Sequence, residues 1–155
     1  MTKATTNTQA KTVADEVLVD ITAFDMVGAC AAGHAATLRN PDGTPTGITL
    51  IVRGAFSPEV VAWNSSTAEK FLNEQRAAQR RGRAPKSKTV DELEAQNIEG
   101  AVVRVADWKG VRQPFSPDQL RASLKRNPHW VAQIIEESES LGNFGTTSES
   151  SSETT

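Results

Sequence analysis

The pattern of apolar residues in the first third of the chain predicts β-structure. Residues 16–24 (EVLVDITAF) alternate imperfectly between apolar and polar positions, which predicts a short strand. Residues 35–39 and 48–53 flank an Asn-Pro-Asp-Gly turn sequence at 40–43, so we expect them to form a β-hairpin. The small residues at 28–36 offer little side chain to pack, and they predict a loop or a close approach of two backbone segments.

At Ser57 the spacing of apolar residues changes to three and four, which predicts helices. Ser57 as N-cap and Pro58 at the first helical position start a helix that we expect to end near Arg81, before Gly82. Its apolar stripe comprises Val60, Trp63, Thr67, Phe71 and Leu72. A basic linker at 82–88, predicted to be mobile, follows this helix.

A second helix is predicted from Thr89, which forms a capping box with Glu92, and its apolar stripe continues to Trp108. The segment 101–105 (AVVRV) has strand propensity and is an alternative strand, although the length of the pattern and the cap favour a helix. Helical structure is therefore the expectation for this part of the chain.

Two further helix starts lie close together in the last third of the chain. Ser116 and Pro117 begin a short helix, because Asn127–Pro128 starts the next one at once. That last helix is expected to end near Gly142, with Phe144 folding back on it. The predicted class is α+β and mainly helical, with an N-terminal strand and a β-hairpin followed by about four helices.

Composition limits the chain to one domain. It has 155 residues, of which 37% are hydrophobic, and both ends lack large apolar side chains apart from Met1. Residues 1–14 and the acidic Ser/Thr tail at 145–155 are predicted to be disordered, which leaves a single domain at 15–144. No apolar run has transmembrane length and no secretion signal is evident, so we expect a cytoplasmic protein without membrane contact.

No catalytic constellation is evident in the sequence. Cys30 is the only cysteine, and His34 and His129 are isolated, so neither a disulfide nor a metal site is expected. Glycine-rich phosphate loops and the serine-hydrolase elbow are both missing from the sequence. We therefore expect a protein that is not an enzyme and has no cofactor.

Charge is unevenly distributed, although the net charge is only −2. A basic patch without any acid comprises Arg76, Arg80, Arg81, Arg83, Lys86 and Lys88. Such a patch is able to neutralise phosphates, but no aromatic residue lies within it for base stacking. A solvated helix end with its linker is the preferred interpretation, and nucleic-acid binding is the weaker alternative.

The three tryptophans allow two interpretations. Trp63, Trp108 and Trp130 each lie on a predicted apolar stripe, so packing in the core is the first interpretation. Tryptophan is also enriched as an anchor in protein interfaces, which is the second.

An ordered set of short motifs resembles the tail assembly chaperones of long-tailed bacteriophages. The set covers residues 33–144 and runs from a Gly-His pair through an N-P-x-G hairpin to a D-W-x-G-V segment, a P-F-S-P-x-x-L helix start and a terminal N-F. Its residues are Gly33, His34, 38–43, Val52, Gly54, Ser57, Trp108, Gly110, Val111, 114–117, Leu120, Trp130, Ile134, Asn143 and Phe144.

The resemblance implies a non-enzymatic protein of the host cell cytoplasm that binds the tape-measure protein and keeps it soluble during tail assembly. The tail-tube protein is a second candidate partner, a homo-oligomer is compatible with the role, and absence from the mature virion is expected. Such families commonly also produce a longer form by translational frameshifting. The alternative is a structural virion protein, either a tail-tube or a connector component. The hypothetical partner-binding residues are Trp108, Phe115, Trp130 and Ile134.

Overall fold

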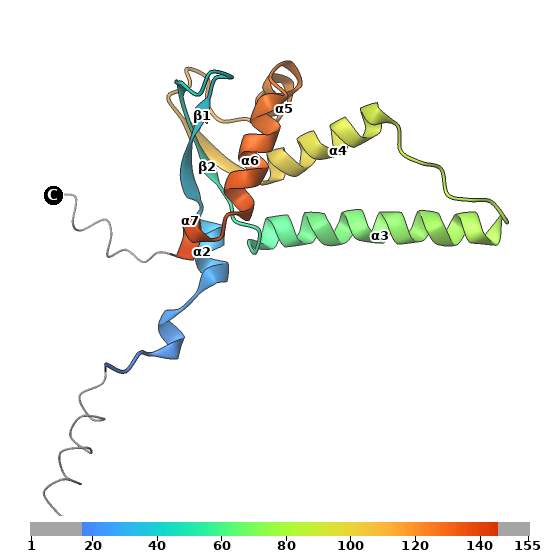
Figure 1. Cartoon of the computed structure of the whole chain (residues 1–155), viewed down its shortest axis with the longest axis horizontal. Helices are drawn as coiled ribbons and strands as arrows, with labels where there is room; N and C mark the ends of the chain where they lie inside the picture. Colours follow the sequence, from blue (N-terminus) through green and yellow to red (C-terminus); the bar gives the residue numbers. More distant parts are fainter. Residues whose placement is uncertain (1–16, 146–155) are drawn as a thin grey trace, which may run out of the picture.

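The computed structural model describes residues 17–145, and it joins a small antiparallel sheet to several helices (Figure 1). The elements in chain order are the 3-10 turn η1 (Ile21–Ala23), α2 (Met26–Ala32), β1 (His34–Arg39), β2 (Pro45–Val52), α3 (Pro58–Arg80), α4 (Val90–Val103), β3 (Val105–Lys109), α5 (Pro117–Arg126), α6 (His129–Glu139) and α7 (Gly142–Gly145). The predicted class, a mainly helical α+β fold, is confirmed.

The sheet has the order β1-β2-β3, and both strand pairs are antiparallel. The predicted hairpin is confirmed, with His34 opposite Val52 in the β1–β2 pair. At its turn, the backbone N–H of Gly43 donates to the carbonyl of Asn40 at 2.9 Å, and Asn40 N–H donates to Thr44 O at 2.8 Å. These bonds fix the register of the hairpin that carries the central strand.

The strand predicted at the N-terminus is wrong over its described part, residues 17–24. Val17 and Leu18 are each 90% exposed, and the chain then enters η1, where the side chain of Asp20 accepts from Thr22 N–H at 3.0 Å. Alternation produces a strand only where a sheet edge and a face to bury are at hand. This segment has neither, and the local Asp20 cap favours a turn.

The loop predicted at 28–36 is also wrong, because α2 and the start of β1 occupy it. Asp25 caps α2 by accepting from Gly28 N–H at 2.9 Å, and the alanine-rich sequence has high helix propensity. The close approach of two backbones, which was the other expectation for this stretch, does occur. Gly54 N–H donates to the carbonyl of Cys30 at 2.9 Å.

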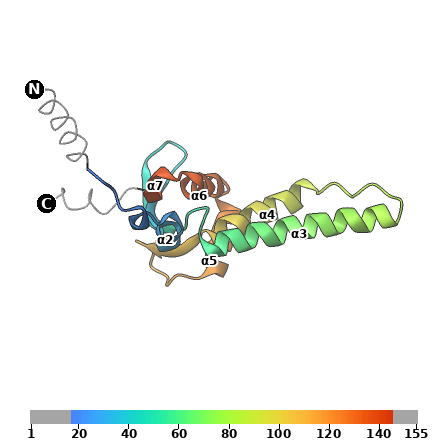
Figure 2. The same ribbon diagram turned by 90° about the horizontal axis from the view of Figure 1, so that it is seen from below.

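Helix α3 begins directly after Ser57 and ends at Arg80, as predicted. Val60, near its start, is fully buried, whereas Phe71 and Leu72 in its second half are 50% and 47% exposed. Both views show α3 extending beyond the sheet, with residues 82–88 returning the chain to α4 without regular structure (Figures 1 and 2). The predicted apolar stripe is therefore used for packing only near the body of the protein.

Helix α4 is shorter than predicted. Thr89 caps it as expected, since its hydroxyl accepts from Glu92 N–H at 3.2 Å, but the helix ends at Val103. Residues 105–109 form β3, which pairs with β2 and places Trp108 opposite Leu50. The sheet edge offered by β2 overrides the helical continuation, and the alternative strand at 101–105 is correct only at Val105.

The last helices begin where the sequence predicts. Ser116 Oγ accepts from Gln119 N–H at 3.4 Å at the start of α5, and Pro128 precedes α6. Phe144 is 5% exposed on α7, and its ring meets the His34 ring edge-on with centroids 5.9 Å apart. Gly145, predicted to belong to the disordered tail, ends α7 instead; residues 1–16 and 146–155 lie outside the described part of the chain.

The core lies between the sheet and helices α4, α5 and α6. Its buried residues are Ala36, Leu38, Leu50, Val52, Ile98, Ala101, Val102, Val105, Leu120, Leu124, Val131 and Ile134. Every strand and each of the three helices contributes to this set, so one contiguous core joins the first and last thirds of the chain.

Candidate partner-binding groove

Two of the residues predicted to bind a partner form an aromatic pair. Trp108 on β3 and Phe115 before α5 have ring centroids 5.2 Å apart at an angle of 84°. Trp108 Nε1 also donates to the carbonyl of Gln113 at 2.8 Å, which closes the turn between them. Both rings are half-buried and pack against the core, which is the packing expected from the first interpretation of the tryptophans.

Trp130 and Ile134, the other two predicted residues, lie one turn apart on α6. Trp130 lines a hollow of about 180 Å³ together with Trp108, so the structure does bring the tryptophans of the last third together. Its buried indole N–H has no hydrogen-bond partner among residues 17–145. Ile134 is 1% exposed and belongs to the core, so direct partner contact by Ile134 does not fit this structure.

A larger groove, which sequence reasoning missed, lies between α4, α5 and α6. Its volume is about 870 Å³. Its lining residues are Asp91, Glu94, Ala95, Asn97 and Ile98 from α4, Leu124 and Lys125 from α5, and Pro128, Val131, Ala132, Ile135, Glu136 and Glu139 at and along α6. Most of its wall is apolar, and the apolar wall continues into the core through Ile98, Leu124 and Val131.

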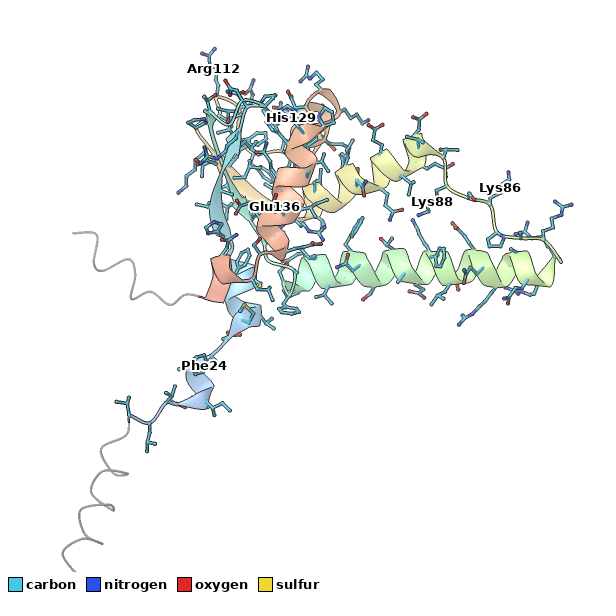
Figure 3. The ribbon with its side chains drawn as sticks, viewed as in Figure 1. Phe24, Lys86, Lys88, Arg112, His129 and Glu136 are labelled. Atoms are coloured by element: carbon cyan, nitrogen blue, oxygen red, sulfur yellow. The ribbon has the colours of Figure 1, made fainter. Side chains whose placement is uncertain are left out.

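The edge of the groove is acidic. Asp91 and Glu94 on α4, and Glu136 and Glu139 on α6, are exposed, while Lys125 is the one cation of the lining. Figure 3 shows Glu136 on α6. A spacing of three residues places each acidic pair on one side of its helix. The sequence contains that local signal, but the meeting of α4 with α6 is a tertiary contact that periodicity does not reveal.

Arg104, at the end of α4, contacts residues of three helices. It is 5% exposed, and its Nη1 donates to Gly100 O at 2.8 Å while Nη2 lies 3.9 Å from Glu139 Oε1. Its guanidinium carbon lies 6.0 Å from the ring centre of Trp63 on α3. Burial lowers the pKa of Arg104, and the carboxylate of Glu139 acts in the opposite direction. Arg104 thus connects three helices.

An ion-pair network fixes α5 against α4. Arg121 pairs with Glu99 through Nε and Nη2, and its Nη1 lies 2.7 Å from Asp118 Oδ1. Hydrogen bonding to Glu99 raises the pKa of Arg121. The two helices that form part of the groove wall are therefore joined by a bidentate, charge-assisted contact, which is the stronger kind of surface ion pair.

The predicted basic patch lies elsewhere, at the far end of α3 and along the segment that returns to α4. Its six residues are exposed, and Figure 3 shows Lys86 and Lys88 on the returning segment. A hollow of about 990 Å³ separates this segment from α3. Lys88 Nζ donates to Gln96 Oε1 on α4, so one of the six cations is held near the start of that helix.

The two residues with candidate metal-binding chemistry in the first third of the chain, Cys30 and His34, lie in different surroundings. His34 Nε2 lies 3.5 Å from Glu137 Oε2, and Cys30 is fully buried. Within residues 17–145 no group of three or more His, Cys, Asp or Glu side chains is arranged to hold a metal ion. In the same range, no helix combines the length and apolar character needed to span a membrane.

Comparison with protein-family models, curated proteins and solved structures finds no match for this chain.

Proposed function

We propose that this chain is a tail assembly chaperone of a long-tailed phage, and that its α4–α5–α6 groove binds helical segments of the tape-measure protein. The observation that carries the proposal is the open, largely apolar groove between three helices. The resemblance of the ordered motifs from Gly33 to Phe144 to that family also supports the proposal. In this role the protein is not an enzyme and acts in the host cytoplasm.

The physical basis is the behaviour of a long amphipathic helix before assembly. Its apolar stripe aggregates unless another surface covers it, and a groove between helices covers such a stripe through side chains at three- and four-residue spacing. Ala95 and Ala132 are exposed lining residues with small side chains, so a helix backbone is able to approach the groove closely. Several copies along one long chain gain from avidity, even where each contact is weak.

The first test is co-expression of this chain with the tape-measure protein of the same phage. We expect the tape-measure protein to remain soluble with the unaltered chain and to precipitate when Ala132→Trp fills the groove. Ala68→Trp, on exposed helix surface of α3, is the matched control and is expected to preserve solubility. Equal solubility of the tape-measure protein with and without this chain would contradict the proposal.

The second test separates an assembly factor from a structural component. Quantitative mass spectrometry of infected-cell lysate and of purified particles measures the chain in both. Abundance in lysate and absence from particles is expected for a chaperone that leaves as the tube forms. A fixed copy number per particle would instead identify a structural virion protein.

A further inference from the structure

The rim of the α4–α5–α6 groove is predominantly acidic. Four carboxylates, those of Asp91, Glu94, Glu136 and Glu139, surround the opening with a single amine, that of Lys125. Among residues 17–145, only Glu139 of these four takes part in an ion pair, at 3.9 Å from Arg104. Like charges collected around one opening repel each other, and within residues 17–145 Asp91, Glu94 and Glu136 have no ion-pair partner that compensates for this repulsion.

The wall of the groove between these carboxylates is apolar, so an occupant must also present apolar side chains. Ile135 is half-buried, and Ala95 and Ala132 are exposed, so the opening presents apolar surface between two acidic edges. A single helix with an apolar stripe fits a surface of this kind. Its flanking positions then lie beside the carboxylates of α4 on one side and of α6 on the other.

We infer that the groove selects amphipathic helices whose apolar stripe is bordered by lysine or arginine. The inference rests on the proposed function and names the chemistry of the helix that the groove accepts. Cations at the two borders pair with Asp91 and Glu94 on one edge and with Glu136 on the other. A helix bordered by glutamate meets like charge on both edges, and this repulsion discriminates against it.

Selectivity, rather than high affinity, is the expected effect of these charges. Each exposed ion pair changes an equilibrium by a factor of about two to five, so three pairs predict a preference of roughly tenfold or more at low salt. Because the carboxylates are exposed, the preference falls as salt rises. The apolar contribution to binding remains at high salt.

The experiment uses the full chain and two synthetic, hydrocarbon-stapled helices labelled with fluorescein. Each is roughly 18 residues long, about 27 Å as a helix. The two share one Leu/Ala stripe and differ only in having lysine or glutamate at its borders. Fluorescence anisotropy at about 50 mM and about 300 mM NaCl measures both affinities, and we expect the lysine helix to bind at least tenfold more tightly at the lower salt.

Two matched double variants locate the preference. Glu94→Lys/Glu136→Lys changes the groove edges, and Glu69→Lys/Glu74→Lys makes the same charge change on exposed positions of α3. The groove variant is expected to lose or reverse the preference for the lysine helix, while the α3 variant keeps it. Thermal unfolding of both variants confirms that each remains folded.

Several outcomes would overturn the inference. Equal binding of the two helices, or the same loss of preference in both double variants, would contradict the proposed charge selectivity. It would still be consistent with a groove that binds helices. If neither helix binds but co-expression still keeps the tape-measure protein soluble, the groove is not the binding site. The proposed chaperone function would then stand without it. Low-salt oligomers that Glu94→Lys/Glu136→Lys converts to monomers would instead identify a second copy of this chain as the occupant.

Discussion

Gly54 packs so tightly against Cys30 that a Cβ built on Gly54 would lie 2.2 Å from Cys30 Sγ and 2.7 Å from its Cβ. The contact joins the end of β2 to α2, and Gly54 N–H donates to Cys30 O across it at 2.9 Å. The carbonyl of Ser138 accepts from the next amide, that of Ala55, at 3.0 Å. Three segments that are distant in the sequence therefore meet at a position where only glycine fits.

Gly54→Ala is expected to lower the free energy of unfolding by about 1–3 kcal/mol, the usual cost of overpacking a tight interior contact. Urea denaturation followed by circular dichroism measures the change. Gly142→Ala is the control, because a Cβ on Gly142 meets nothing within 4 Å. A Gly54→Ala protein as stable as the unaltered chain would show that α2 is not held against β2 in solution.

The edge-on pair of Trp108 and Phe115 predicts a coupling between two residues of the 107–120 segment. Each single change to alanine is expected to cost about 2–4 kcal/mol, somewhat less than for a fully buried aromatic residue. The double-mutant cycle should show a coupling of about 0.5–1.5 kcal/mol, as aromatic pairs do. Denaturant unfolding of the four proteins gives both quantities.

This cycle also separates packing from partner binding for the aromatic residues. If Trp108→Ala leaves stability unchanged and abolishes capture of the tape-measure protein, the interface interpretation of this tryptophan is correct. Loss of stability with residual capture by the folded fraction supports the packing interpretation. Trp130→Ala is interpreted in the same way. Trp130→Phe is the companion variant, because it removes an indole N–H that has no hydrogen-bond partner within residues 17–145 and keeps an aromatic ring.

Local signals in the sequence predicted most of the elements. The caps at Thr89 and Ser116 and the Asn-Pro-Asp-Gly turn act through bonds between near neighbours in the chain, so sequence alone is sufficient to place them. The strand β3 and the fate of residues 17–24 depend instead on where a free sheet edge lies. Residues 105–109 pair with the edge of β2, whereas residues 17–24 pair with no strand of the described chain. Strand propensity alone does not distinguish these two cases.

The candidate site was less predictable for a related reason. Trp108, Phe115 and Trp130 do gather near one turn, as their spacing suggested, but they pack largely against the core. The groove lies between α4, α5 and α6, and its acidic edges on α4 and α6 are about 40 residues apart in sequence, from Glu94 to Glu136. Helix periodicity gives the face of each helix separately, and only the packed structure shows that two such faces meet.

The turn of the β-hairpin carries a carboxylate with a lowered pKa. Hydrogen bonds from the side chain and then the backbone of Thr44, at 2.7 and 3.0 Å, lower the pKa of Asp42 from its ordinary value. Since the folded pKa is lower than the unfolded one, Asp42 contributes stability above its ordinary pKa. That contribution is lost as pH falls through the folded value.

Thr44→Val removes the hydroxyl donor, so the pKa of Asp42 is expected to rise toward its ordinary value. The side-chain carboxyl resonance of Asp42, followed by NMR through a pH titration, measures the shift. Thr22→Val is the control, because Thr22 makes the equivalent bonds to Asp20 and should leave Asp42 unchanged. An unaltered Asp42 titration in Thr44→Val would contradict the hydrogen-bond origin of the shift.

The apolar segment before α2 is predicted to contribute nothing to the stability of the fold. Val17, Leu18 and Val19 are 90%, 90% and 70% exposed, and Phe24 lies on the same stretch outside the sheet and its covering helices (Figure 3). Val17→Ser/Leu18→Ser/Val19→Ser should therefore change the free energy of unfolding by no more than about 0.5 kcal/mol, as for other exposed positions. Val52→Ser, at a fully buried position, is the contrasting control and should be strongly destabilising.

A large loss of stability in the triple variant would show that the segment packs against the protein in solution. An unchanged stability with reduced aggregation at high concentration would instead identify the segment as exposed adhesive surface.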